Sequence, residues 1–220
     1  DLAQKIDIFK PTVDAVVKGN PKSLLLVEFA EENMDENHRR LKKLHQLMGE
    51  LGYSWNKGMR NGGVVDVIDS NLQSKVSEMR KSGLNIMMSM KNDAKPVSFI
   101  EDCAVELKDL AEYTDGLNKI FDKYNVKGTW YAHASVGCLH VRPVLNMKIQ
   151  DDVDKMRNIA NETSSLVKKF KGSYSGEHGD GIARSEFNEV MFGKKMTNVF
   201  KSIKNSFDPL NIFNPGKIVD

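Results

Sequence analysis

The sequence predicts an α+β fold in which an antiparallel or mixed sheet is covered mainly on one face by helices. Stretches with strand character are few and short, whereas stretches with apolar residues at helical spacing are long. Their order is strand, helix, strand, helix, strand, strand, helix, followed by a helical tail. Long helices beside few strands fit such a layered arrangement. No internal repeat, low-complexity segment or convincing linker is visible.

The first half of the chain is predicted to hold one strand and two helices. The apolar run at 23–29 (SLLLVEF) is bounded by polar residues, which indicates a buried strand. Residues 33–51 place apolar side chains on one helical face, and Gly52 ends that pattern. A second helical pattern runs from Ile68 past Arg80.

Two other stretches of the first half are assigned by composition. Residues 53–63 contain Gly58, Gly62 and Gly63, so they predict a loop. The methionines at 87–90 are expected in the core, because methionine fills irregular gaps between apolar side chains.

The second half is predicted to hold three strands and most of the helices. Acidic residues at the start of a helix are favourable, so Asp151 and Asp152 mark a helix start, and Gly172 marks its end. The predicted elements are strand 97–105, helix 106–124, strands 129–134 and 139–147, helix 151–171, a short helix near Asn188 and a longer helix up to Ser206.

Composition sets limits on the class of protein. The 220 residues are 40% hydrophobic and 28% charged with a net charge of +2, an ordinary soluble composition. No basic run interleaves with aromatics, so we expect no nucleic-acid partner. No apolar run is long enough for a transmembrane segment. Two cysteines without a CxxC motif favour a reducing, cytoplasmic compartment. The chain opens on Asp1 in helix-like sequence, which suggests a piece of a longer polypeptide.

His133 and His140 are the first candidates for chemistry. They are seven residues apart, an odd spacing that would place them on opposite faces of one continuous strand. We therefore expect the intervening residues, which include Gly137, to turn, so that two strand ends present both imidazoles to one point. Imidazole pairs are common ligands of zinc and related ions. Two unrelated histidines near a hairpin would give the same spacing.

Glu177 and His178 form the second candidate, between Gly176 and Gly179. Flanking glycines allow a close backbone approach, so Glu177 could complete a His-His-Glu ligand set and His178 could act as a base. A glycine-rich surface turn with incidental polar residues is an equally simple interpretation. The GxGxxG, GxxxxGK[ST] and HExxH motifs are absent.

Other polar residues give weaker signals. Arg142 follows His140 by two positions, so on a strand it shares that face and could bind a carboxylate through two hydrogen bonds. Arg80 and Lys95 are further cationic candidates, although each alone suggests a surface charge. His38 and His45 lie among lysines and arginines, which indicates a solvated helix face. Cys138 is expected to be a small core side chain.

Three motifs together resemble the C-terminal domain of FAD-linked oxidases. They are His133-x6-His140, the SGEHGDG stretch at 175–181 and the FDPLNIFNPGK stretch at 207–217, in the family's order. That family includes D-lactate dehydrogenases, the glycolate oxidase flavin subunit and D-2-hydroxyglutarate dehydrogenases. The resemblance extends from about Lys22 to Val219. It implies that residues 1–220 are a ferredoxin-like substrate and cap domain that packs on a separate, upstream FAD-binding domain.

The resemblance also implies roles for individual residues. His133, His140 and Glu177 would bind a divalent metal, zinc or manganese, and His178 would be the base. Arg142, Arg80 and Lys95 would bind a small 2-hydroxy-acid substrate. Asn214 and Lys217, in the third motif, would bind the cofactor.

The implied function is oxidation of a D-2-hydroxy acid, with hydride passing to FAD and then to an unidentified acceptor. The implied location is cytoplasmic, with peripheral attachment to the inner membrane as an alternative. A metal-dependent hydrolase and a non-catalytic docking domain remain open as other functions of the same residues. The hydrolase would be active without flavin, and the docking domain would bind no metal.

The chain departs from the common family pattern in the first motif. Relatives often have His-x-Gly-Asp-Gly-Asn-x-His, whereas this chain has Ala134–Cys138 (ASVGC) between the histidines and Arg142 where many have Asn. Both features resemble the long branch in which the flavin module continues into an iron–sulfur region. An iron–sulfur cluster beyond Asp220 is therefore expected.

Overall fold

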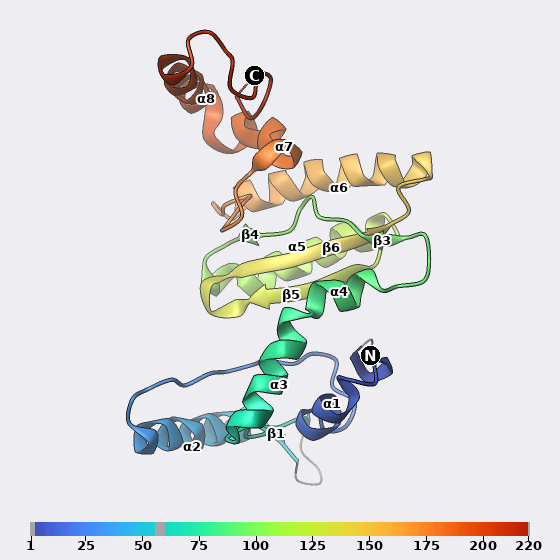
Figure 1. Cartoon of the computed structure of the whole chain (residues 1–220), viewed down its shortest axis with the longest axis vertical. Helices are drawn as coiled ribbons and strands as arrows, with labels where there is room; N and C mark the ends of the chain where they lie inside the picture. Colours follow the sequence, from blue (N-terminus) through green and yellow to red (C-terminus); the bar gives the residue numbers. More distant parts are fainter. Residues whose placement is uncertain (1–2, 56–59, 220) are drawn as a thin grey trace. The chain divides into compact units, whose positions relative to one another are not determined.

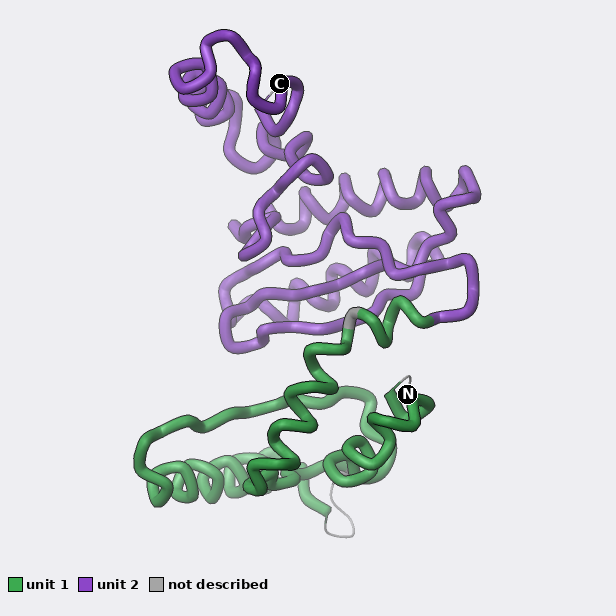
Figure 2. Tube along the Cα trace, viewed as in Figure 1, with its two compact units in different colours: residues 1–89 green, residues 90–220 purple. Residues whose placement is uncertain are grey.

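The computed structural model describes residues 3–55 and 60–219 and divides the chain into two compact units. Unit 1 is Asp1–Ser89 and unit 2 is Met90–Asp220 (Figure 2). The division falls just after a helix, where the sequence shows neither a proline nor a glycine-rich linker. Composition therefore gives no sign of it.

Unit 1 consists of helices and a two-residue strand pair (Figure 1). Side chains cap the two long helices: Asn33 accepts from the backbone N–H of Asp35, and Asp69 accepts from that of Leu72. Both predicted helices are confirmed. The elements are η1 Ala3–Lys5, α1 Lys10–Val16, α2 Met34–Glu50, β1 Tyr53–Ser54, β2 Arg60–Asn61, α3 Ser70–Lys81 and α4 Gly83–Met88.

Two predictions for unit 1 are wrong. Residues 23–29 form no strand, and Leu24 and Leu25 are 70% and 74% exposed, because no neighbouring strand in the described parts of the chain pairs with them. The methionine group is not core, since Met88 on α4 is 44% exposed. The predicted loop at 53–63 contains β1 and β2, which pair in parallel, while Gly58 lies outside the described residues.

Unit 2 contains a four-stranded sheet and the longest helices (Figure 1). Its strands β5 and β6 form a hairpin, as predicted, and its helices α5 and α6 match the predicted 106–124 and 151–171. The elements are β3 Lys95–Pro96, β4 Cys103–Ala104, η2 Leu107–Asp109, α5 Leu110–Lys123, β5 Gly128–His133, η3 Ala134–Val136, β6 Cys138–Leu145, α6 Gln150–Lys169, α7 Gly181–Arg184, η4 Ser185–Phe187 and α8 Asn188–Phe207.

The α+β class is confirmed, and the strand order of unit 2 is ferredoxin-like. Strand β6 pairs antiparallel with β5, β4 and β3, and Ala104 of β4 also bridges Ser173, which follows α6. The sequence β4–α5–β5–β6–α6–Ser173 is thus a split βαββαβ motif. Its spatial order is Ser173, β4, β6, β5.

One face of this sheet forms the core with α5 and α6. Leu139, Val141 and Leu145 alternate along β6 and are almost fully buried, as are Leu117 of α5 and Ile159 of α6. Residues that alternate with them, such as His140 and Arg142, belong to the opposite face. The fold therefore presents a polar strand face that the helices do not cover.

Two details differ from the predicted elements. The predicted strand 97–105 is interrupted by bends and turns, so only its Cys103–Ala104 part, β4, is a strand, and β3 lies just before the predicted range at Lys95–Pro96. The predicted short helix near Asn188 and the longer helix up to Ser206 are one element, α8, which kinks at Gly193, whose φ is 80°. No described helix is both long and apolar enough to cross a membrane.

Candidate functional site

The β5–β6 hairpin brings His133 and His140 onto one sheet face, as the spacing predicted. Tyr131 pairs with His140 and His133 pairs with Cys138, so alternate residues of both strands point the same way. The turn is a short 3-10 segment closed by Gly137 at φ 67°. A Cβ there would lie 2.0 Å from the Val105 carbonyl oxygen, so glycine is required. The two imidazole centroids are 5.0 Å apart.

The 175–178 loop is fastened to this face by the carboxylate of Asp102. The side chain is fully buried and accepts from the backbone N–H groups of Glu177 and His178, both at 2.9 Å. It also accepts from the Ser175 hydroxyl at 2.7 Å. Asp102 itself has φ 75°, which turns the chain between β3 and β4. One carboxylate thus holds the backbone of Glu177 and His178 in place.

Gly176 and Arg184 complete the attachment of the loop. The N–H of Gly176 donates to the Asp102 carbonyl oxygen at 2.6 Å, and a Cβ on Gly176 would lie 3.0 Å from both that oxygen and the Ala104 Cβ. Glycine therefore lets the loop lie directly on the sheet. The buried Arg184 guanidinium donates at 2.6 Å to the carbonyl oxygens of Glu101 and Gly179, which ties the next turn to the same place.

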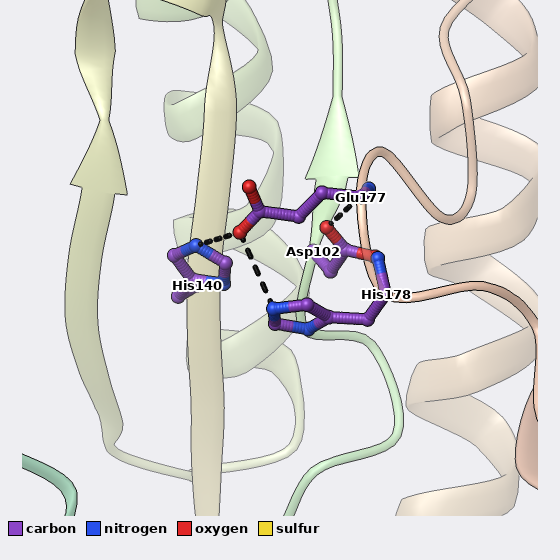
Figure 3. Close-up of side chains that lie close together, drawn as sticks. All are labelled: Asp102, His140, Glu177 and His178. Atoms are coloured by element: carbon purple, nitrogen blue, oxygen red, sulfur yellow. Dashed lines mark hydrogen bonds and ion pairs between the residues drawn. The ribbon is translucent and has the colours of Figure 1, made fainter.

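Three imidazole nitrogens converge on one oxygen of Glu177. The distances from Glu177 Oε1 are 2.9 Å to His140 Nε2, 3.3 Å to His178 Nε2 and 3.7 Å to His133 Nε2. Figure 3 shows Glu177 reaching from the loop to His140 on β6, with His178 below it. The sequence-predicted His133, His140, Glu177 and His178 are therefore brought together.

Burial sets the ionisation of the site. It lowers the pKa of His140, although Glu177 and Glu101 act in the opposite direction, so the neutral, metal-binding imidazole is favoured. Burial also raises the pKa of Asp102, but hydrogen bonds from Ser175, His178 and Glu177 outweigh it and hold that pKa below its ordinary range. Burial raises the pKa of the Cys138 thiol to about 12, so Cys138 is neutral; it is buried on the histidine face, where its Sγ lies 3.5 Å from Asp102 Oδ1, rather than in the core cluster as predicted.

Glu101 occupies the other edge of the histidines. The rings of His140 and His178 are stacked, with centroids 5.1 Å apart and 23° between planes. Glu101 Oε1 lies 2.9 Å from His178 Nδ1, and Oε2 accepts from the Arg142 guanidinium. Arg142 also donates from Nε to the Ser98 hydroxyl at 2.9 Å. Arg142 therefore lies on the predicted face but is engaged by a carboxylate.

The donors present fit a divalent transition metal. Imidazole nitrogens with one carboxylate oxygen are the ligand types that zinc and manganese accept. Single ligand atoms of Asp102, His140, Glu177 and His178 all lie within 4.8 Å of one another. Asp102 suits this role poorly, because its oxygens already accept from the loop. His133, with its Nε2 beside Glu177, has no such competing role.

The remaining predicted residues belong to other segments of the chain. Arg80 is in the last turn of α3 in unit 1. Lys95 pairs with Leu145, five positions along β6 from His140, and its Nζ donates to the Met90 carbonyl. Asn214 and Lys217 follow α8 and line one hollow with Phe213 and Lys204. Asp208 folds this tail by accepting from the N–H groups of Ile212 and Phe213.

Sequence reasoning missed Glu101 and Asp102. Their signal was present, because two adjacent acids interrupt the apolar run VSFIEDCAV at 97–105. Acidic residues are rarely buried without partners, so such a pair indicates buried hydrogen bonds. Their partners in the 175–178 loop are 73 to 77 residues away in the chain.

A model of the family described as FAD linked oxidases, C-terminal domain, matches residues 5–218. The chain belongs to this family. The family resemblance inferred from three motifs is therefore confirmed, and the split βαββαβ order of unit 2 is how this FAD linked oxidase C-terminal domain positions its histidines.

Relatives of this C-terminal domain are dehydrogenases and oxidases by name. It is 31% identical to the D-2-hydroxyglutarate dehydrogenase of Haemophilus influenzae over 97% of this chain and 21% of that protein. It is 31% identical to the enzyme of that name from Escherichia coli over 89% of this chain and 19% of that protein. It is 28% identical to the glycolate oxidase subunit GlcD of Bacillus subtilis over 65% and 30%. The chain thus spans well under a third of the length of these relatives.

Proposed function

We propose that this chain is the C-terminal substrate- and metal-binding domain of a flavin-dependent dehydrogenase that oxidises a D-2-hydroxy acid. The observation that carries the proposal is the convergence of three imidazole Nε2 atoms on Glu177 Oε1 in a member of this family. The names of the relatives supply the substrate class: D-2-hydroxyglutarate, glycolate and D-lactate.

His133, His140 and Glu177 would hold the divalent metal, zinc or manganese. A bound ion would act as a Lewis acid towards the substrate hydroxyl. His178, fixed beside this ligand set by Asp102 and Glu101, would accept the hydroxyl proton at Nε2. Its position next to Glu177 places the base and the metal ligands close enough to act on one bound substrate molecule.

The substrate carboxylate needs a cation near the ligands. Arg142 is the predicted cation that lies on the histidine face, and its Nη1 is the part of the guanidinium not used on Ser98 or Glu101. Arg80 and Lys95 stay predictions for the same role. FAD would be bound mainly by the part of the protein outside this chain, with Asn214 and Lys217 on the cofactor side, and would supply the hydride acceptor. The iron–sulfur region also stays a prediction, as does the cytoplasmic location.

The test uses the full-length protein. Anaerobic addition of D-2-hydroxyglutarate, D-lactate or glycolate is expected to bleach the flavin absorbance with one of the three. His178→Ala should slow that bleaching by ~10²- to 10⁴-fold, the usual contribution of a general base. His38→Ala, on the exposed side of α2, is the matched control and should leave the rate unchanged.

Three outcomes would contradict the proposal. Flavin that none of the three acids reduces would remove the substrate class. Ester or amide hydrolysis by the protein without flavin, dependent on metal and on His140, would instead favour the metal-dependent hydrolase. Elemental analysis that finds no metal in active protein would favour a domain that docks without binding one.

A further inference from the structure

We propose that Glu101 is a positioning residue that holds the imidazole of His178 in its working orientation, with the proton on Nδ1 and Nε2 open towards the ligands. This inference rests on the proposed function, because it assigns a helper to the proposed base. Nothing in the three family motifs points to Glu101, which lies outside all of them.

The geometry separates Glu101 from the ligand set. Glu177 contacts the Nε2 atoms of the stacked rings of His140 and His178, whereas Glu101 faces their Nδ1 atoms. The two carboxylates therefore lie on opposite edges of the imidazole pair. A residue on the Nδ1 edge can orient a ring and fix which nitrogen carries the proton, as carboxylates do for functional histidines elsewhere.

Glu101 serves His178 more directly than His140. Its Oε1 lies 2.9 Å from His178 Nδ1, a full hydrogen bond, whereas its Oε2 lies 3.9 Å from His140 Nδ1. The buried His140 Nδ1 has no hydrogen-bond partner among the described residues. His140 is held instead by its strand and by the surrounding packing.

Glu101 is itself held in place by Arg142 and by the turn at Asp102. Both oxygens of Glu101 are used, one by His178 and one by the Arg142 guanidinium, and the residue is 9% exposed. Arg142 is itself fixed by Ser98. Since Oε2 accepts from the Arg142 guanidinium, Oε1 is aimed at His178 Nδ1 and orients the ring with its Nδ1–H towards Glu101.

The experiment compares Glu101→Gln and Glu101→Asp with wild type in the full-length protein. Glutamine keeps the shape but loses the charge that binds Arg142, and aspartate keeps the charge but shortens the reach. The measured quantities are the rate constant of flavin reduction at saturating substrate, the substrate concentration for half-saturation, and metal per chain. Glu106→Gln is the control, because Glu106 forms a surface ion pair with exposed Lys108.

The rate constant of Glu101→Gln should fall ~10- to 100-fold, the usual cost of removing such a supporting carboxylate. Metal content should stay at the wild-type level, since the ligands keep their places. Glu101→Asp should recover part of the rate. A Glu101→Gln rate within about twofold of wild type, or metal lost in step with the rate, would overturn the proposal.

A structural readout separates this inference from the proposed function. If the wild-type flavin is reduced by no 2-hydroxy acid, the substrate class fails, and crystal structures of wild type and Glu101→Gln still test Glu101. The expected result is a His178 ring that leaves its wild-type orientation while His133, His140 and Glu177 stay in place. An unmoved His178 ring, or displacement of all four residues, would overturn the positioning role.

Discussion

Unit 2 has a core and unit 1 has almost none among its described residues. In unit 1 only Thr12, Val13 and Ile86 are buried in the described ranges, whereas unit 2 buries apolar side chains from β6, α5 and α6 together. Both units contain amphipathic helices, and the apolar residues Met34 and Leu47 of α2 remain over half exposed. An amphipathic pattern therefore predicts a helix. The apolar face of that helix is buried only where a sheet or a second helix packs against it.

The same contrast applies to two histidine–carboxylate pairs. His45 Nε2 lies 2.9 Å from Asp66 Oδ1 in unit 1, and His140 Nε2 lies 2.9 Å from Glu177 Oε1 in unit 2. The side chain of His45 is 46% exposed, and that of His140 is 5% exposed with two further imidazoles nearby. Equal distances thus mark an ordinary surface pair in one unit and a converging site in the other.

Asp102→Ala should have the largest effect, because it leaves buried N–H and hydroxyl donors without an acceptor. We expect unit 2 to lose ~3–5 kcal/mol of unfolding free energy. Urea unfolding of a Trp55→Phe background, followed by Trp130 fluorescence, would report unit 2 alone. The control is Asp66→Ala in unit 1, followed by Trp55 fluorescence in a Trp130→Phe background, and it should cost no more than about 1 kcal/mol. Equal effects of the two substitutions would erase the contrast between the units.

Leu117→Ala should follow in size, since Leu117 is 1% exposed between the sheet and α6. The expected loss is ~2–5 kcal/mol, the range for a buried leucine that leaves a cavity. Leu47→Ala on α2 is its counterpart, with a leucine of the same kind that is 51% exposed. Its loss should stay below about 1 kcal/mol in the same unfolding assay with Trp55 retained as the probe. A comparable loss at Leu47 would mean that α2 is covered after all.

His140→Ala should weaken metal binding by at least ~10- to 100-fold, because a nearly buried ligand is removed. Metal per chain would be measured by elemental analysis after dialysis against a fixed free zinc concentration. His45→Ala should leave metal content unchanged despite the equal distance to its carboxylate. Retention of metal by His140→Ala would show that the convergence on Glu177 does not hold an ion.

Met88→Ala should have the smallest effect, within about 1 kcal/mol, because the side chain is largely exposed and alanine favours a helix. Thermal unfolding of the Met88→Ala variant beside Ile86→Ala, which removes a buried side chain from the same helix, would check it. A larger loss at Met88 than at Ile86 would restore the predicted core role of the methionine group.

Local sequence patterns predicted the helices and strands better than they predicted what packs against each of them. The helix at 33–51 and the hairpin around Gly137 depend on residues close in sequence, and both are confirmed. The prediction of a strand at 23–29 is wrong because an apolar run becomes a strand only when another strand pairs with it. The four clustered residues were predictable as types, yet Glu101 and Asp102 act on partners beyond the reach of any local pattern.

Glu101 and Asp102 are neighbours in the chain but support the 175–178 loop in different ways. Asp102 holds the backbone of Glu177 and His178, and Glu101 holds the His178 ring. The positive φ of Asp102 lets two consecutive carboxylates take these separate directions. Inserting one residue here would shift the two carboxylates relative to these partners, even with every side chain kept. The length of the connection between β3 and β4 is therefore as much a part of the site as its histidines are.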